Sequence, residues 1–185
     1  MYQTLLNIAL ISAVVVLLGV YVSWRATRID RLHVRLETAR AGLDVALVRR
    51  AAVALELAAS RLLDPATSLL LAAAAHEARI ADADNREFAE SDLSRALRAV
   101  VGQPGFRDTL VGRGDGAALL EELDAAVRKV AYARSFYNNA VTGTRAARRK
   151  LLPRALHLAG RAPLPEFFEI DDAPPETSAD TVRSG

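Results

Sequence analysis

The sequence predicts an all-α protein, in which an N-terminal transmembrane helix continues into an elongated antiparallel bundle of three to four helices. Three features predict this fold: an uninterrupted apolar N-terminus, apolar residues at helical spacing beyond it, and an aromatic content of only 5%. A core of alanine, leucine and valine favours close helix packing, whereas strands favour β-branched and aromatic residues. We expect an anchor at residues 1–24, a helical domain at 25–170 and a disordered tail at 171–185.

The first 24 residues carry no charged side chain. From Leu5 to Trp24 about 20 apolar residues, at ~1.5 Å each, span the ~30 Å of a bilayer's hydrocarbon. A cleaved signal peptide is one alternative, but no lysine or arginine precedes the run and the residues after it form a poor cleavage site. A buried core helix is another, but the segment is apolar on every face. The sequence therefore predicts an uncleaved, single-pass anchor.

Basic residues follow the apolar segment and none precedes it. Arg25, Arg28, Arg31 and Arg35 stand against a single acidic residue, Asp30, in the turns after Trp24. The positive-inside rule then places the C-terminal domain in the cytoplasm and the short N-terminus outside the cell membrane.

After Arg25 the chain is no longer apolar on every face. Apolar residues recur there in steps of three and four, which places them as a stripe on one face of a helix. It comprises Ile29, Leu32, Leu36, Ala39, Leu43 and Ala46. We expect one helix to continue from the anchor to about Leu63. Asp64 is then a good cap for a second helix, with Pro65 at its first position.

The second helix is expected to run from Pro65 to about Val100. Its predicted apolar stripe comprises Leu69, Leu70, Ala73, His76, Ile80, Leu93 and Leu97. The polar segment from Asp82 to Asp92 could bend or break it, and Ser91 with Asp92 could cap a restart.

Glycine and proline residues at 101–116 predict a loop, and a third helix is expected after Asp115. Its stripe comprises Leu120, Leu123, Val127, Val130, Tyr137 and Val141. The helix ends in basic residues before Pro153, and a further short helix could occupy Arg154–Ala159. Three long antiparallel helices would place the 101–116 loop near the membrane and the basic end of the third helix far from it.

The segment from Ala131 to Val141 resembles the signature AR-x-x-YN-x-x-V of the LemA family of bacterial membrane proteins. The matching residues are Ala133, Arg134, Tyr137, Asn138 and Val141. Shorter likenesses occur in the expected order at Asp44–Arg50, His76–Glu77 and Phe167–Glu169. The segment after Arg50 departs from the family pattern, so the chain resembles a divergent member. The resemblance implies an N-terminal anchor and an antiparallel helical domain, and it implies no reaction.

Two groups of polar residues are candidate interaction sites. Tyr137 and Asn138 could hydrogen-bond a neighbouring helix or contact a partner, and Arg134 should pair with a carboxylate or extend outward. A basic patch comprises Arg145, Arg148, Arg149, Lys150 and Arg154. These side chains are either simply exposed to water at the end of a helix, or they bind an acidic partner.

No residue pattern predicts catalysis. The chain has no cysteine, which excludes disulfides and thiol chemistry, and its three histidines, His33, His76 and His157, fall on different elements. We therefore expect no metal or cofactor, and a net charge of +2 does not predict nucleic-acid binding. The predicted function is a non-enzymatic, membrane-anchored scaffolding or interaction module that binds a protein partner or itself. The alternatives are an electrostatic binder acting through Arg145–Arg154 and an enzyme acting near the membrane.

Overall fold

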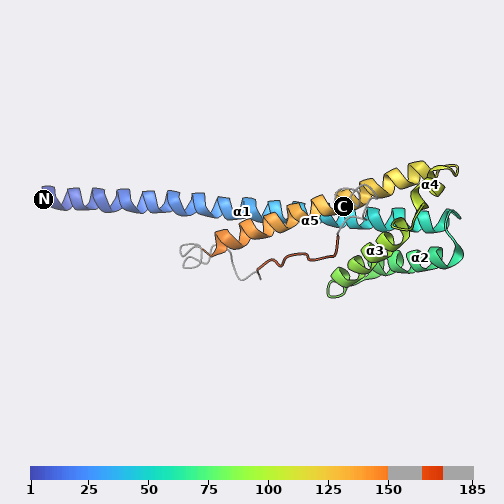
Figure 1. The fold of residues 1–185 in the computed structure, drawn as a ribbon. Coiled ribbons are helices and arrows are strands. Elements are labelled where there is room, and N and C mark those ends of the chain that lie inside the picture. Colours follow the sequence, from blue (N-terminus) through green and yellow to red (C-terminus); the bar gives the residue numbers. More distant parts are fainter. Residues whose placement is uncertain (150–163, 173–185) are drawn as a thin grey trace, which may run out of the picture. The chain divides into compact units, whose positions relative to one another are not determined.

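A computed structural model describes residues 1–149 and 164–172, apart from the side chains at positions 25, 26, 28 and 29. The described residues form five helices and no strand (Figure 1). The helices are α1 (Tyr2–Ala59), α2 (Pro65–Ile80), α3 (Arg86–Val101), α4 (Phe106–Val111) and α5 (Gly116–Arg148). The predicted all-α class is confirmed. The chain divides into two compact units: the first contains Met1–Ala39 and Asn138–Glu166, and the second contains Arg40–Tyr137 and Phe167–Gly185.

The first unit contains the apolar segment Tyr2–Trp24, which is a helix long and apolar enough to cross a membrane. Its large apolar side chains are exposed from end to end, as expected for a helix that contacts lipid rather than a protein core. The same unit contains the last turns of α5. There Val141 and Thr144 are buried, and the Arg145 Nε donates a hydrogen bond of 2.7 Å to the Pro165 carbonyl.

The second unit contains the C-terminal third of α1 and most of α5, packed antiparallel. Leu57, near the end of α1, shares an apolar cluster with Leu119 at the start of α5, whereas Leu43 clusters with Val130 further along. The predicted stripes are confirmed on both helices. On α1 Ala39, Leu43 and Ala46 are buried, and on α5 the buried residues of the predicted stripe are Leu120, Leu123, Val130 and Val141.

The break between α1 and α2 comes four residues earlier than predicted. Helix α1 ends at Ala59, and Arg61 takes a left-handed conformation with φ of 62° that no helix can continue. Asp64 caps α2 as predicted, since its side chain accepts hydrogen bonds from the backbone N–H groups of Ala66 and Thr67. A hydrogen bond with the Thr67 side chain, together with these backbone hydrogen bonds, lowers the pKa of the Asp64 carboxyl.

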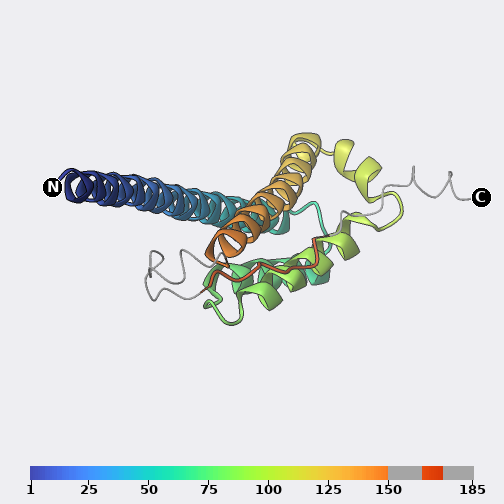
Figure 2. The same cartoon turned by 90° about the vertical axis from the view of Figure 1, so that its left-hand side faces the viewer.

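Two helices occupy the place of the predicted second helix. The chain breaks after Ile80, and α3 restarts at Arg86, so the proposed cap at Ser91 and Asp92 is wrong because both lie inside α3. Helices α2 and α3 lie side by side as a hairpin (Figure 2). The stripe predicted on α2 is also wrong: its apolar members, such as Leu69 and Ile80, are exposed. The buried face comprises Leu71, Ala75 and Ala78.

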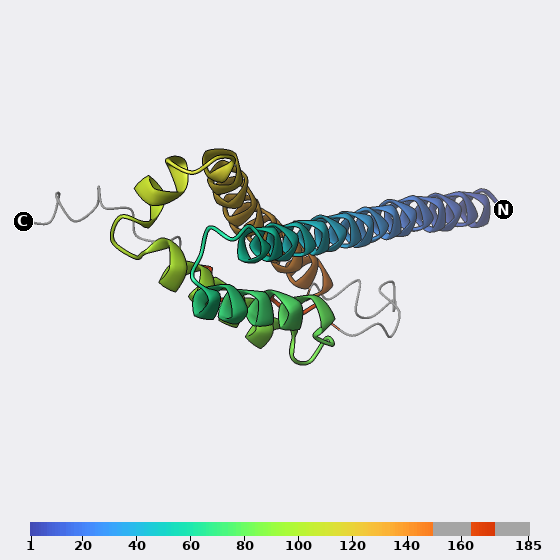
Figure 3. The same cartoon turned by 90° about the vertical axis from the view of Figure 1, so that its right-hand side faces the viewer.

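The predicted 101–116 loop contains the short helix α4 (Figure 3). Its Phe106 and Leu110 are buried in the core of the second unit. Gly116 starts α5 where a side chain would collide with the Leu110 carbonyl, so glycine is required there. Because α2 and α3 form a hairpin, α4 packs beside the end of α1, where its Phe106 and Leu110 share an apolar cluster with Leu57. Helix α5 then returns along α1. The expectation that its basic end lies far from the apolar segment is wrong, because the two share the first unit.

Candidate functional site: a C-terminal strap beside a buried ion pair

Residues 167–172 form an extended segment of the second unit, here called the strap (Figure 1). Ile170 is buried and Phe168 half-buried in an apolar cluster built by α1 and α5. The other members of this cluster are Leu43, Ala46, Leu47, Val130, Ala133 and Tyr137. The two strap residues are two positions apart, as expected when alternate side chains of an extended chain face the same surface.

The strap's backbone hydrogen-bonds to side chains of α3. The N–H of Glu169 donates to Glu87 Oε1 at 2.9 Å, and the N–H of Asp171 donates to Ser91 Oγ at 3.2 Å. These N–H groups belong to alternate residues, as do the apolar side chains at 168 and 170. The strap thus combines backbone hydrogen bonds to side chains of α3 with apolar side chains at alternate positions. Peptides that add to a sheet edge are likewise held by their backbone and by alternate side chains.

Two ion pairs hold the end of the strap. Arg134 on α5 donates to Asp172 through Nε at 2.6 Å and through a terminal nitrogen at 2.8 Å, a bidentate arrangement. Arg98 on α3 pairs with the Asp171 carboxylate and also donates to the Asp171 carbonyl at 3.4 Å. The prediction that Arg134 pairs with a carboxylate is confirmed. Asp171 and Asp172 fall within the predicted disordered tail, yet both have defined contacts; the rest of that tail lies outside the described residues.

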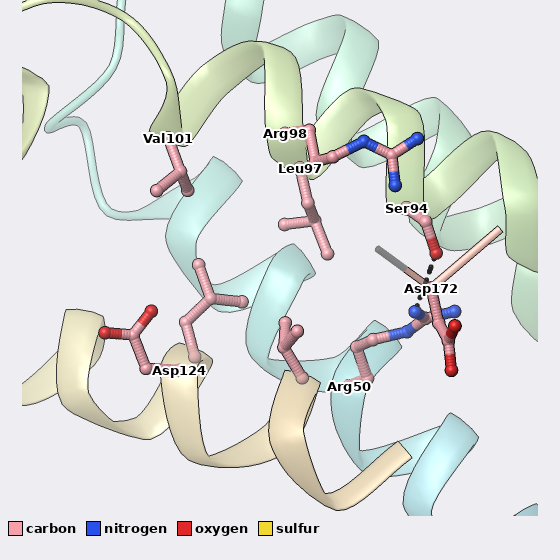
Figure 4. A pocket seen from close by; sticks show the side chains of 9 residues that line it. Arg50, Ser94, Leu97, Arg98, Val101, Asp124 and Asp172 are labelled. Atoms are coloured by element: carbon pink, nitrogen blue, oxygen red, sulfur yellow. Dashed lines mark hydrogen bonds between the residues drawn. The ribbon is translucent and has the colours of Figure 1, made fainter. Parts of the chain in front are cut away.

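A buried ion pair joins α1 to α3 close to the strap. Arg50 on α1 donates to Glu90 Oε2 at 2.7 Å, and both side chains are only 2% exposed. The same guanidinium donates to Ser94 Oγ at 2.8 Å (Figure 4) and to the Glu90 carbonyl at 3.1 Å. Arg50 Nε is buried and has no hydrogen-bond partner among the described residues. Burial raises the pKa of the Glu90 carboxyl, and the nearby Arg50 charge opposes that rise.

A cavity of about 10 Å³, roughly the space that one water molecule needs, is lined by Arg50 of the buried pair and by Asp172 of the strap. Its lining comes from α1, α3, α5 and the strap, and comprises Arg50, Ser94, Leu97, Arg98, Val101, Leu123, Asp124, Val127 and Asp172. The Ser94 hydroxyl accepts from Arg50 on α1 and donates to the Glu90 carbonyl of its own helix at 2.9 Å, so its hydrogen-bonding capacity as donor and as acceptor is used. The described residues contain no group of three or more side chains able to hold a metal ion.

A second bidentate pair lies at one edge of the cavity. Arg107 on α4 donates to both carboxylate oxygens of Asp124 on α5, at 2.9 and 3.0 Å. The hydrogen bonds that Arg107 donates to the Asp124 carboxylate raise the pKa of the Arg107 guanidinium. Charged side chains therefore join α5 to α4 as well as to the strap, and an arginine is the donor in each pair.

The structure divides the predicted interaction residues between the two units. Ala133, Arg134 and Tyr137 contact the strap, whereas Asn138 is half-buried and Val141 buried in the first unit. Of the basic patch, Arg149 is exposed, and Arg145 and Arg148 are half-buried. Lys150 and Arg154 lie outside the described residues, as does the possible helix at Arg154–Ala159.

Several residues of this site were not singled out from the sequence, among them Glu87, Glu90, Arg98, Ile170 and Asp172. Arg50 was noted only as part of a family-like segment. A signal for the buried pair was present, because Arg50 follows Leu47 by three residues and precedes Ala54 by four, on the buried stripe of α1.

With this geometry established, the chain was compared with known proteins. No family model, curated protein or solved structure matches it. The resemblance to the LemA family therefore stays a prediction from the residues of the signature, and function must be argued from the site itself.

Proposed function

We propose that this chain is a single-pass protein of the cell membrane whose helical domain binds a protein partner through the site that holds the strap. The observation that carries the proposal is the way in which the strap is bound. An extended segment is held by backbone hydrogen bonds, by two alternate apolar side chains and by the side-chain carboxylates of its last two residues, Asp171 and Asp172. This combination is a known mode of peptide recognition.

The chemistry of the strap defines the partner that the site would accept. A matching segment is extended, carries apolar residues two positions apart, and continues into acidic residues that reach Arg98 and Arg134. The chain's own strap competes with it, because a tethered segment is present at a high effective concentration. A partner therefore binds well only when the strap is released. A matching segment of a second copy would bind in the same way.

Anchoring is supported by the length and apolar character of Tyr2–Trp24. We place the N-terminus outside and the helical domain in the cytoplasm, because the basic residues all follow the segment. Since the chain has no cysteine, Gln3→Cys and Ser178→Cys can be treated with an impermeant maleimide in intact cells. We expect Gln3→Cys to react and Ser178→Cys to react only after lysis; the reverse pattern would overturn this orientation.

Photocrosslinking tests the partner site. A photoreactive residue at Arg95 lies on the same face of α3 as Ser91 and Arg98, and Arg95 is itself exposed. Asp84, exposed in the α2–α3 connection, is the matched control position. The strap is loosened by Asp171→Asn with Asp172→Asn, which keeps the shape of both side chains and removes their charges.

We expect a defined crosslinked product from position 95 that increases when the strap is loosened. A synthetic peptide of residues 167–172 should compete for it, whereas a scrambled peptide should not. The product should be absent at position 84. If position 95 gives no product, or gives only what position 84 gives, or if the product is insensitive to both the strap variant and the peptide, the interaction role is wrong.

A further inference from the structure

The basic end of α5 shares a compact unit with the apolar segment. The first unit joins Met1–Ala39 to Asn138–Glu166. In the views of this part of the chain, the orange end of α5 lies beside the blue part of α1 (Figure 1).

The juxtamembrane part of α1 and the end of α5 are both short. From Trp24 to Ala39, α1 rises about 22 Å at ~1.5 Å per residue. From Asn138 to Arg148, α5 rises about 15 Å within the same compact unit. The headgroup layer on one side of a bilayer is ~5–7 Å deep. Long arginine side chains cover such distances with their charged ends in the polar layer.

The charge in this region is predominantly positive. Arg31 and Arg35 are exposed on α1, Arg149 is exposed on α5, and Arg148 is half-buried beside it. The sequence adds Arg25 and Arg28 directly after the apolar segment. Four to eight basic residues directly beyond a transmembrane helix are typical of a surface that attracts anionic lipid. An acidic protein would have to approach the same charges next to the membrane, where anionic headgroups are already concentrated.

We propose that the juxtamembrane part of α1 and the last turns of α5 together form a basic collar that binds the anionic phospholipid headgroups of the chain's own membrane. This inference rests on the membrane anchoring proposed above and is independent of the strap site. Its consequence is that the lipid composition changes the depth and the mobility of the last turns of α5.

The test uses the full chain in nanodiscs, with a spin label on Ala146→Cys, an exposed position between the basic residues of α5. One set of discs contains phosphatidylcholine alone and the other contains phosphatidylcholine with phosphatidylglycerol. Co-purification with the discs first establishes that the chain is anchored, so a failure of anchoring is seen separately. Depth and mobility of the label are then measured by electron paramagnetic resonance.

We expect the label to lie at headgroup depth and to be slowed only in discs with phosphatidylglycerol. Arg148→Gln with Arg149→Gln should lower the ratio of lipid-bound to free label roughly fivefold for each arginine removed. The matched control is Arg128→Gln with Lys129→Gln, an exposed pair with the same charge change on the same helix. It should leave the ratio unchanged.

Three results would overturn the proposal. The first is a label that behaves identically in both lipid mixtures. The second is an equal loss in the two double variants, which would indicate a response to net charge alone. The third is the same slowing in phosphatidylcholine discs after addition of inorganic phosphate, which would indicate a site for free anions rather than for a lipid surface.

Discussion

Two kinds of arginine–carboxylate pair lie within one part of the second unit, and they differ mainly in burial. The pair of Arg50 with Glu90 joins α1 to α3 with both side chains 2% exposed. The pairs that hold the strap are partly open to water: Arg98 is 24% and Asp171 47% exposed, and Arg134 is 29% and Asp172 14% exposed. Each pair joins an arginine to a carboxylate, but only the strap pairs can exchange their partners for water at low cost.

The difference in burial predicts that the Arg50–Glu90 pair stays formed, whereas the two pairs of the strap open and close reversibly. Breaking a buried pair leaves a charge without solvent, whereas breaking an exposed pair restores hydration to both charges. The helices around Arg50 should therefore stay together when the strap leaves. The strap site would then remain formed and available to a partner.

The largest effect is expected from Arg50→Met, which removes the cation and leaves the Glu90 carboxylate buried. We expect the free energy of unfolding of the helical domain to fall by about 3–5 kcal/mol at neutral pH. The measurement is chemical denaturation of the full chain in nanodiscs, followed by circular dichroism. Arg50→Met with Glu90→Leu should recover most of the loss, because no buried charge remains. A double variant as unstable as the single one would contradict this account of the pair.

The same variant should depend on pH with a definite sign. Burial already raises the folded-state pKa of Glu90 above its unfolded value, and Arg50 opposes the rise. Without Arg50 the folded-state pKa should rise further. In the folded Arg50→Met variant, Glu90 then takes up a proton at a higher pH than it does in the unfolded chain. The free energy of unfolding of this variant therefore increases as pH falls. The stability difference between the natural chain and Arg50→Met should therefore narrow on acidification, and a constant difference from neutral to acidic pH would contradict this.

A smaller effect is expected at the apolar part of the strap. Ile170→Ala removes the one strap side chain that is buried, at 9% exposed. We expect the strap to open more readily by about 2 kcal/mol, the low end for such a truncation, because the site is at the domain surface. Hydrogen exchange of the Glu169 and Asp171 amides should accelerate by roughly 30-fold. Exchange in the core at Leu93 should stay unchanged, and an equal acceleration there would mean that the strap is part of the core.

The sequence predicts much of this fold because its signals are local. The apolar N-terminus, the stripes of α1 and α5, and the cap at Asp64 each depend on residues within a few turns of one another. The α2–α3 region is less predictable, because its alanine-rich helix offers apolar faces on both sides. Leu69 and Ile80 make one such stripe, but Leu71 and Ala75 are the buried residues, and this depends on the packing partners.

The site is predictable only in part, for a related reason. Arg134 interrupts an apolar stripe, which indicates a charged partner without identifying it. Asp171 and Asp172 lie in a segment of proline, acidic and serine residues whose composition is typical of disorder. Their contacts join positions 38 residues apart at Arg134 and 73 apart at Arg98, and no periodic pattern relates such distant positions.

The smallest effects are expected at the two strap carboxylates, and they should differ from each other. Asp172→Asn breaks a bidentate pair with a mostly buried carboxylate, and we expect the strap to open more readily by about 1–2 kcal/mol. Asp171→Asn breaks a more exposed pair, for which an effect of about 0.2–1 kcal/mol is typical. Hydrogen exchange of the Asp171 amide, with and without added salt, measures both. Salt should weaken the Arg98–Asp171 contribution more than the Arg134–Asp172 one, because exposed charges are screened more strongly. Equal effects of the two substitutions, with equal salt dependence, would mean that burial does not distinguish these pairs, and the contrast drawn with Arg50 and Glu90 would then need another cause.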